Sequence, residues 1–177
     1  MAVFYFEQFF PISVVLFFMK TIFQIPRNLP QFEKPALFVS SGEYEANFYL
    51  VFMGKMIKKE QIKMPPREEA KEKQGFVGRK GGMQSLSAVS HHGAYIEDLK
   101  KKFQKIVHRK IHDFIAEFKL EEIYLFAPRY ASKRIIDGLD KSEQKKVRMK
   151  FFKELTKINP LEMIKIFQKE LEKIKVS

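Results

Sequence analysis

The chain has 177 residues, of which 45% are hydrophobic and 31% are charged. This size suits one domain, and this composition excludes a disordered, collagen-like or purely coiled-coil protein. Cysteine is absent, which excludes a disulfide framework, a thiolate metal site and a cysteine nucleophile. Lys and Arg exceed Asp and Glu by 12, and such an excess favours an acidic partner, either nucleic acid or an anionic membrane surface.

The first nineteen residues are more apolar than the rest of the chain, and Glu7 is their only charge. A membrane-spanning helix needs about 20 predominantly apolar residues, whereas Gln8 and Pro11 interrupt this run. A signal peptide would have a positive amino end and a small-residue cleavage site, and this segment shows neither pattern. Three interpretations stay open: a weak membrane anchor, an extra strand or helix packed on the domain, or a translated leader before a start at Met19. We expect contact with a membrane only if residues 1–19 are a genuine anchor.

Residues 1–34 are expected to precede the folded domain as an apolar leader and a proline-rich lead-in. Pro26, Pro30 and Pro35 disfavour a helix and predict an extended chain between them. The domain itself is expected to span residues 35–175.

Three short segments rich in aromatic and branched residues then predict an antiparallel meander. Gly54 and Lys55 are expected to form the tight turn between the second and third strands. The third segment alternates between its two faces, which predicts an edge strand with one solvated face. The predicted strands are Ala36–Ser40, Asn47–Met53 and Met56–Met64.

Residues 67–92 have almost no hydrophobic periodicity and contain several glycines among charged and small residues. A structureless stretch of this length in a compact domain is usually functional or disordered. The sequence therefore predicts a flexible, basic, glycine-rich loop.

Helices and strands alternate after this loop. Apolar residues recur every three or four positions from Gly93 to Phe118, which predicts an amphipathic helix of about seven turns. Asn159 and Pro160 supply the cap and the first position of a last helix. Between these helices we expect a buried strand at Glu122–Ala127 and a short helix at Ser132–Leu139. Val147–Phe152 is expected to be a strand, and a helix is the competing interpretation there.

The resulting order, β-β-β-α-β-α-β-α, predicts a single α/β domain with a mixed sheet and helices packed on the sheet. This order is similar to that of ribonuclease-H-like folds. A fold of this kind supports many activities, so the function has to be argued from particular residues.

The predicted loop reads Gly-Arg-Lys-Gly-Gly-Met-Gln-Ser-Leu from residue 78 to residue 86. It resembles the G-R-G-G-Q-S loop in the middle domain of eukaryotic and archaeal polypeptide release factors and of their relative Pelota. The resemblance implies that Gly81 and Gly82 let the backbone enter the ribosomal peptidyl-transferase centre, where side chains would clash. It also implies that Gln84 helps to place water at the ester of peptidyl-tRNA, while Arg79 and Lys80 contact RNA phosphates.

Met83 separates the glycine pair from Gln84 and departs from the release-factor motif. One extra residue moves the amide by up to about 3.5 Å along the chain, which is more than near-attack geometry normally tolerates. A flexible RNA-contact loop, a hydrolytic loop and a disordered linker therefore stay open as interpretations.

A second resemblance is to the bacterial host attachment protein family, whose members look like single-domain relatives of that middle domain. The resemblance depends on the order and spacing of short segments around the long helix. They are Ala36-Leu37-Phe38, Tyr124 to Arg129, and Lys153 to Lys157 ahead of Asn159-Pro160. The family's name implies a surface or interaction protein.

Basic residues gather in two segments where acidic residues are sparse. Lys101, Lys105 and Arg109 lie on the predicted long helix, and Lys145, Lys146 and Arg148 lie in the carboxyl-terminal part. A run of charges is usually only a solvated face. The alternative is a continuous phosphate-binding surface, whose affinity would fall steeply with salt, and we expect these six residues to contact RNA.

Two histidines on the long helix have a spacing that can hold zinc, since His108 and His112 are four residues apart. The acidic residue that a zinc protease carries between them is missing. We therefore predict no metal site and no other cofactor.

The leading hypothesis is a cytoplasmic, ribosome- or tRNA-associated protein that binds RNA through a basic face and the glycine loop. One alternative is a peptidyl-tRNA hydrolase acting through Gly81, Gly82 and Gln84, although we favour a non-enzymatic role. The other alternative is a cell-surface protein that takes part in host attachment. The sequence predicts no oligomeric state.

Overall fold

A computed structural model of the chain describes residues 21–65 and 85–176, except for the side chains of residues 85–92, 175 and 176. The strands are β1 (Ile22–Gln24), β2 (Ala36–Ser41), β3 (Glu45–Phe52), β4 (Lys55–Lys63), β5 (Glu122–Phe126) and β6 (Val147–Phe151). The helices are α2 (Ser85–Phe118), α3 (Arg129–Asp137), α4 (Lys141–Gln144) and α5 (Pro160–Val176).

The strands form one mixed sheet in the order β1-β4-β3-β2-β5-β6. β2 pairs with antiparallel β3 on one side and with parallel β5 on the other. Beyond them, β4 and β1 continue the antiparallel part, and β6 continues the parallel part. The predicted α/β architecture with a mixed sheet and packed helices is confirmed.

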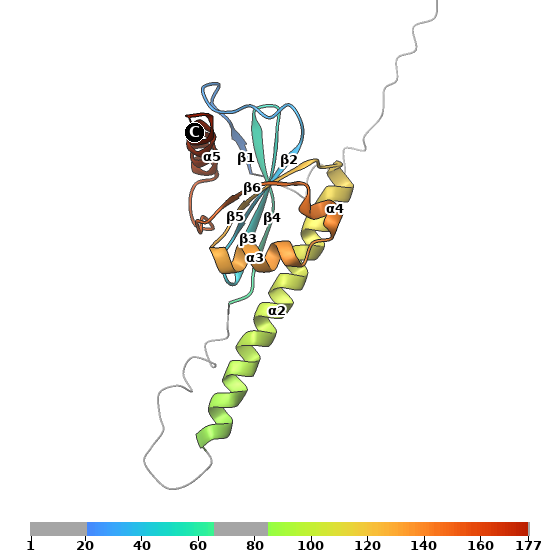
Figure 1. Ribbon diagram of the computed structural model, residues 1–177, viewed down its shortest axis with the longest axis vertical. Helices are drawn as coiled ribbons and strands as arrows, with labels where there is room; N and C mark the ends of the chain where they lie inside the picture. Colours follow the sequence, from blue (N-terminus) through green and yellow to red (C-terminus); the bar gives the residue numbers. More distant parts are fainter. Residues whose placement is uncertain (1–20, 66–84, 177) are drawn as a thin grey trace, which may run out of the picture.

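Helices cover both faces of this sheet (Figure 1). On one face, Val107 of α2 packs in a core with Val39 of β2. On the other face, Phe167 of α5 packs in a second core with Phe38 of β2. Because β2 sends alternate side chains into the two cores, all of its residues are buried, which explains the apolar run Ala36–Val39 at its start.

β1 is an edge strand that the sequence pattern does not reveal. It pairs with the first residues of β4, with Ile22 opposite Ile57, so β4 is not the edge of the sheet over that part of its length. The lead-in after β1 also contributes Ile25, Leu29 and Phe32 to the core beneath α5. The expected start of the domain at residue 35 therefore leaves out one strand and three core side chains.

The long helix α2 begins at Ser85, eight residues before the predicted start at Gly93, so the last part of the predicted loop is helical. It ends at Phe118, where Lys119 has a left-handed φ of 49°, a common way to terminate a helix. Phe103 is the first α2 side chain in the core, and the amino-terminal part of α2 extends beyond the sheet (Figure 1).

The elements after β5 agree with the predictions except for α4. β6 is a strand, and Asn159 accepts a hydrogen bond from the Leu161 N–H at 3.0 Å as the cap of α5. α3 starts earlier than predicted, directly after Pro128. The short helix α4 begins with a capping box, in which Asp140 and Glu143 each accept a backbone N–H of the other. The D-x-x-E spacing of this box is a signal that was readable in the sequence.

Candidate functional site

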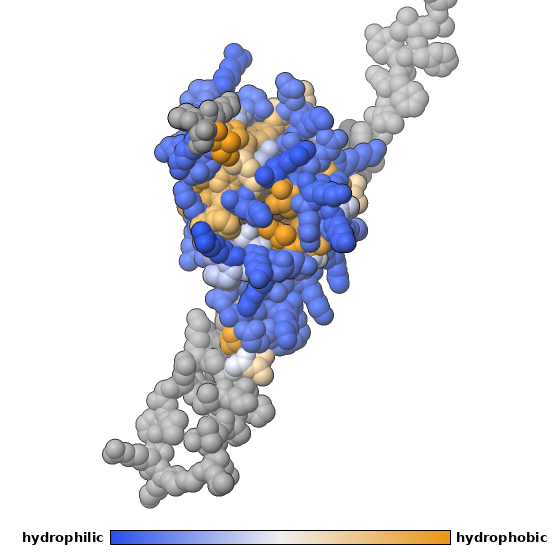
Figure 2. All heavy atoms as spheres, in the orientation of Figure 1, coloured by the Kyte–Doolittle hydropathy of each residue, from blue (hydrophilic) through white to orange (hydrophobic). Residues whose placement is uncertain are grey.

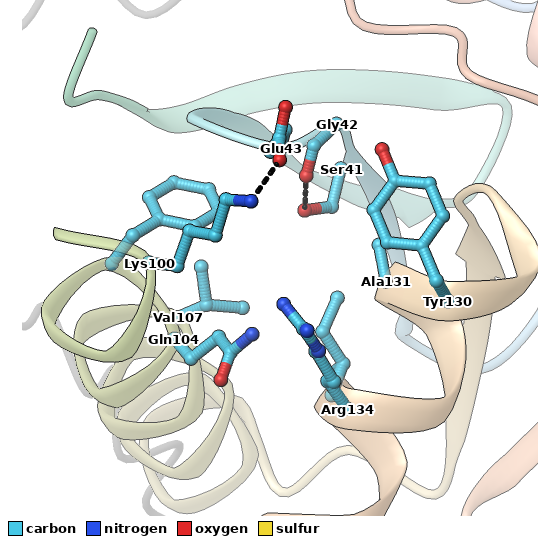
Figure 3. A pocket seen from close by; sticks show the side chains of 11 residues that line it. Ser41, Gly42, Glu43, Lys100, Gln104, Val107, Tyr130, Ala131 and Arg134 are labelled. Carbon is cyan, nitrogen blue, oxygen red and sulfur yellow. Dashed lines mark hydrogen bonds and ion pairs between the residues drawn. The ribbon is translucent and has the colours of Figure 1, made fainter. Parts of the chain in front are cut away.

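A shallow depression, open to solvent, lies at the carboxyl end of β2 between α2 and α3 (Figure 3). From β2 the chain continues into β3, and from the neighbouring parallel strand β5 it continues into α3. Sheets of this type bind ligands beyond the carboxyl ends of parallel strands where the connections diverge. The lining residues are Ser41, Gly42, Glu43, Lys100, Phe103, Gln104, Val107, Tyr130, Ala131, Arg134 and Ile135.

The floor of the depression is apolar and its rim is polar. Phe103 and Val107 belong to the core below. At the rim, Lys100 Nζ lies 2.7 Å from Glu43 Oε1, and this hydrogen bond raises the pKa of the Lys100 ammonium group. The charge of Lys100 is therefore balanced within the protein.

Arg134 is the second cation at the rim, and its guanidinium points into the depression opposite Lys100 and Gln104 (Figure 3). No carboxylate of the described residues forms an ion pair with it. A guanidinium presents several N–H donors in a planar fork that matches phosphate or carboxylate oxygens. Arg134 is thus available to an anionic group entering from solvent.

Lys101, Lys105 and Arg109 form what we call the α2 stripe. They are four residues apart, which places them on one face of α2, and all three side chains are exposed. None of them forms an ion pair with a described carboxylate. In the view of Figure 2, hydrophilic residues make up most of the surface over α2, with some apolar residues exposed near α3 and at the lower end of α2.

The α2 stripe starts at the level of the depression along the helix axis. Lys101 follows Lys100 directly and lies one helical turn from Gln104, and both of these neighbours line the depression. From Lys101 to Arg109 the stripe runs about 12 Å along the helix. With 3.6 residues per turn, the stripe lies on a different face of α2 from the residues that line the depression, so it runs along the outer side of the helix.

The carboxyl-terminal basic residues lie elsewhere. Lys146 Nζ donates a hydrogen bond to the Leu120 carbonyl at 2.7 Å, and Arg148 Nε lies 3.7 Å from Glu122 Oε1. Both partners are at the amino end of β5, whereas the depression is at the carboxyl end of its parallel neighbour β2. Lys145 is exposed at the end of α4. Two of the six cations expected to contact RNA, Lys146 and Arg148, therefore have partners within the protein.

The predicted loop residues Arg79, Lys80, Gly81, Gly82 and Gln84 lie outside the described residues. The nearest described position is Ser85 at the start of α2. Along the helix, Ser85 is about 22 Å from Lys100 at the depression. The hydrolytic role of the loop stays a prediction.

The two histidines of α2 have different partners. His108 is half-buried against Gly138, where an added Cβ would overlap its imidazole ring, and burial lowers its pKa. His112 Nδ1 lies 2.7 Å from Glu143 Oε1 of α4. In the described part of the chain, no three His, Asp or Glu side chains are placed to share a metal ion.

The contact between His112 and Glu143 should make folding stability depend on pH. The hydrogen bond with Glu143, followed by its negative charge, raises the pKa of His112. The stabilisation should therefore be complete below the ordinary histidine pKa of about 6.5 and disappear as the pH rises through the higher pKa of the folded state. Urea unfolding of the wild type and His112→Gln should show a free-energy difference that shrinks over this range. A difference independent of pH would contradict the assignment, and Glu143→Gln should abolish the pH dependence.

The sequence did not single out Arg134, Tyr130, Glu43 or Gln104, because none of them belongs to a recognisable motif. One signal was present: Tyr130 and Arg134 closely follow the strand β5, and residues after the carboxyl ends of parallel strands often carry ligand sites. The pairing of α3 with α2, which brings Arg134 close to Lys100, required the structure.

Membrane contact was predicted only for residues 1–19, which lie outside the described residues. Within residues 21–65 and 85–176, no helix combines the length and the apolarity needed to cross a bilayer.

Comparison with known proteins identifies one family. No curated protein matches the chain. A family model described as "Protein required for attachment to host cells" matches residues 36–166, a range that runs from β2 into α5 and includes the depression and the α2 stripe. Because this match covers well over half of the sequence, the chain belongs to the family of proteins described as required for attachment to host cells.

Proposed function

We propose that this protein binds structured RNA through the α2 stripe and Arg134. The RNA would be that of the ribosome or a tRNA. The observation that carries this proposal is the set of four cations without described carboxylate partners, three of them in register on one exposed helix face. Phosphates of a folded RNA are spaced regularly and attract such rows of Lys and Arg. The net charge of +12 acts in the same direction, and a cytoplasmic location follows from this role.

We further propose that the domain is a relative of the middle domain of release factors and Pelota, with a ribonuclease-H-like order of strands. In its support, β2 lies between antiparallel β3 and parallel β5, and the long helix α2 precedes β5. In this proposal, Arg79 and Lys80 add phosphate contacts in front of α2. The enzymatic version of this proposal is hydrolysis of peptidyl-tRNA by the loop residues Gly81, Gly82 and Gln84. Loss of peptidyl-tRNA turnover in Gln84→Ala would support this version.

The second candidate function is host attachment, and the description of the family favours it. In this case the cations of the α2 stripe would bind acidic groups on a cell surface instead of RNA phosphates. The two candidates predict different locations for the protein in a fractionated cell.

Sedimentation with ribosomes at low and high salt tests the proposed function. We expect the protein to pellet with ribosomes at low salt and to be released at high salt, because phosphate contacts exchange with counterions. Recovery in the membrane fraction after a high-salt wash, with none on ribosomes at low salt, would contradict RNA binding and favour attachment.

A further inference from the structure

Two aromatic rings and an arginine are exposed just after the carboxyl ends of β5 and β6, and one of the rings, Tyr130, lines the depression. Tyr130 is 50% exposed and Phe152 is 52% exposed. The guanidinium carbon of Arg129 lies 5.1 Å from the centre of the Phe152 ring. The Ala127 N–H donates to the Phe151 carbonyl at 3.0 Å, and this bond holds the two strand ends together.

The core does not need these exposed rings. Phe151, directly before Phe152, fills the inward position and stacks on Phe126 with ring centres 4.3 Å apart. Phe152 belongs to neither core cluster, and its ring lies beside the guanidinium of Arg129. An exposed aromatic ring with an arginine against it is the arrangement on which proteins stack unpaired nucleobases.

The polar groups around the rings suit the rest of a nucleotide. Tyr130 lines the depression into which Arg134 points, so a phosphate joined to a stacked base has a cation within the same site. Partial burial, followed by the negative charges of Glu43 and Glu154, raises the pKa of Tyr130. Carboxylate oxygens accept hydrogen bonds from the exocyclic amino groups of bases.

We propose that Phe152, Tyr130 and Arg129 form a stacking site for an unpaired base of single-stranded RNA, whose adjoining phosphate binds Arg134. This inference depends on the proposed function, since the α2 stripe supplies the binding of the RNA backbone. The bases of a duplex are stacked inside the helix, so only an unpaired overhang or loop reaches this site.

The test compares two RNAs that differ in one base. Both consist of the same stem with a short single-stranded overhang, and in one of them a single overhang nucleotide is abasic. By fluorescence anisotropy, the wild type should bind the RNA with the intact base about 5- to 150-fold more tightly than the abasic RNA, the range expected for stacking of one base. Phe152→Ala should bind both RNAs equally, whereas Phe152→Tyr should keep the preference.

Met53→Ala is the matched control, because Met53 is 71% exposed in the turn between β3 and β4, at the opposite end of β2 from the depression. This variant should keep the wild-type preference for bases. Equal binding of both RNAs by the wild type would overturn the stacking site and leave RNA binding by the α2 stripe intact. Failure to bind either RNA would overturn the proposed function itself, and the stacking site with it.

Discussion

Replacing Lys101, Lys105 and Arg109 together by glutamine is expected to weaken the binding of a structured RNA about 100-fold at moderate salt. A charge-assisted contact at an exposed site contributes about 1 kcal/mol, so three lost contacts amount to about 3 kcal/mol, or roughly two orders of magnitude in affinity. The three side chains are exposed and have no described carboxylate partner, so their loss should leave folding intact. The affinity is measured by titration at one fixed salt concentration.

α5 offers a matched control for this variant. Lys165, Lys169 and Lys173 have the same four-residue spacing, and α5 covers the opposite face of the sheet (Figure 1). Their replacement by glutamine changes the net charge of the protein by the same amount. An equal loss of affinity in the two variants would show that RNA responds only to net charge, and would contradict a specific role for the α2 stripe.

Phe38→Ala is expected to reduce the free energy of unfolding by about 3 to 5 kcal/mol, the usual cost of removing a buried phenylalanine. Phe38 is fully buried in β2 at the middle of the sheet. Its ring centre lies 5.0 Å from that of Tyr124, 5.4 Å from that of Phe32 and 5.9 Å from that of Phe167. The substitution therefore opens a cavity shared by the lead-in, β5 and α5. Urea unfolding followed by circular dichroism gives the free energy.

Phe152→Ala is the control, because it makes the same substitution at an exposed position. It should change the free energy of unfolding by no more than about 0.5 kcal/mol. If Phe38→Ala also cost less than about 1 kcal/mol, the arrangement of the aromatic core around β2 would be wrong. Because a domain of this size has a total stability of about 5 to 15 kcal/mol, the expected loss is large enough to measure and leaves the protein folded at low temperature.

The sequence predicts most of the fold because most of its elements bury a regular face. β2 and β5 are continuous apolar runs buried on both sides, and α2 repeats apolar residues at helical spacing. β1 has only three residues, and it is held by backbone pairing with β4. Such pairing leaves no hydrophobic pattern in a short segment, so this strand could not be predicted.

The candidate site is predictable in part. The α2 stripe follows from spacing on a helix, since residues four apart share a face wherever the helix packs. The roles of Lys146 and Arg148 could not be predicted in this way, because their partners Leu120 and Glu122 come from a distant part of the sequence. The same holds for Arg134, which reaches the depression only because α3 packs beside α2.

The most direct test of RNA binding by the α2 stripe is the slope of log affinity against log salt concentration for a structured RNA. Each phosphate contact contributes about 0.7 to 0.9 to this slope. The slope should therefore be shallower by about 2 to 3 when Lys101, Lys105 and Arg109 are glutamine, and should equal the wild-type slope in the α5 control. Identical slopes for the wild type and the α2 variant would contradict the proposal that these cations bind phosphates.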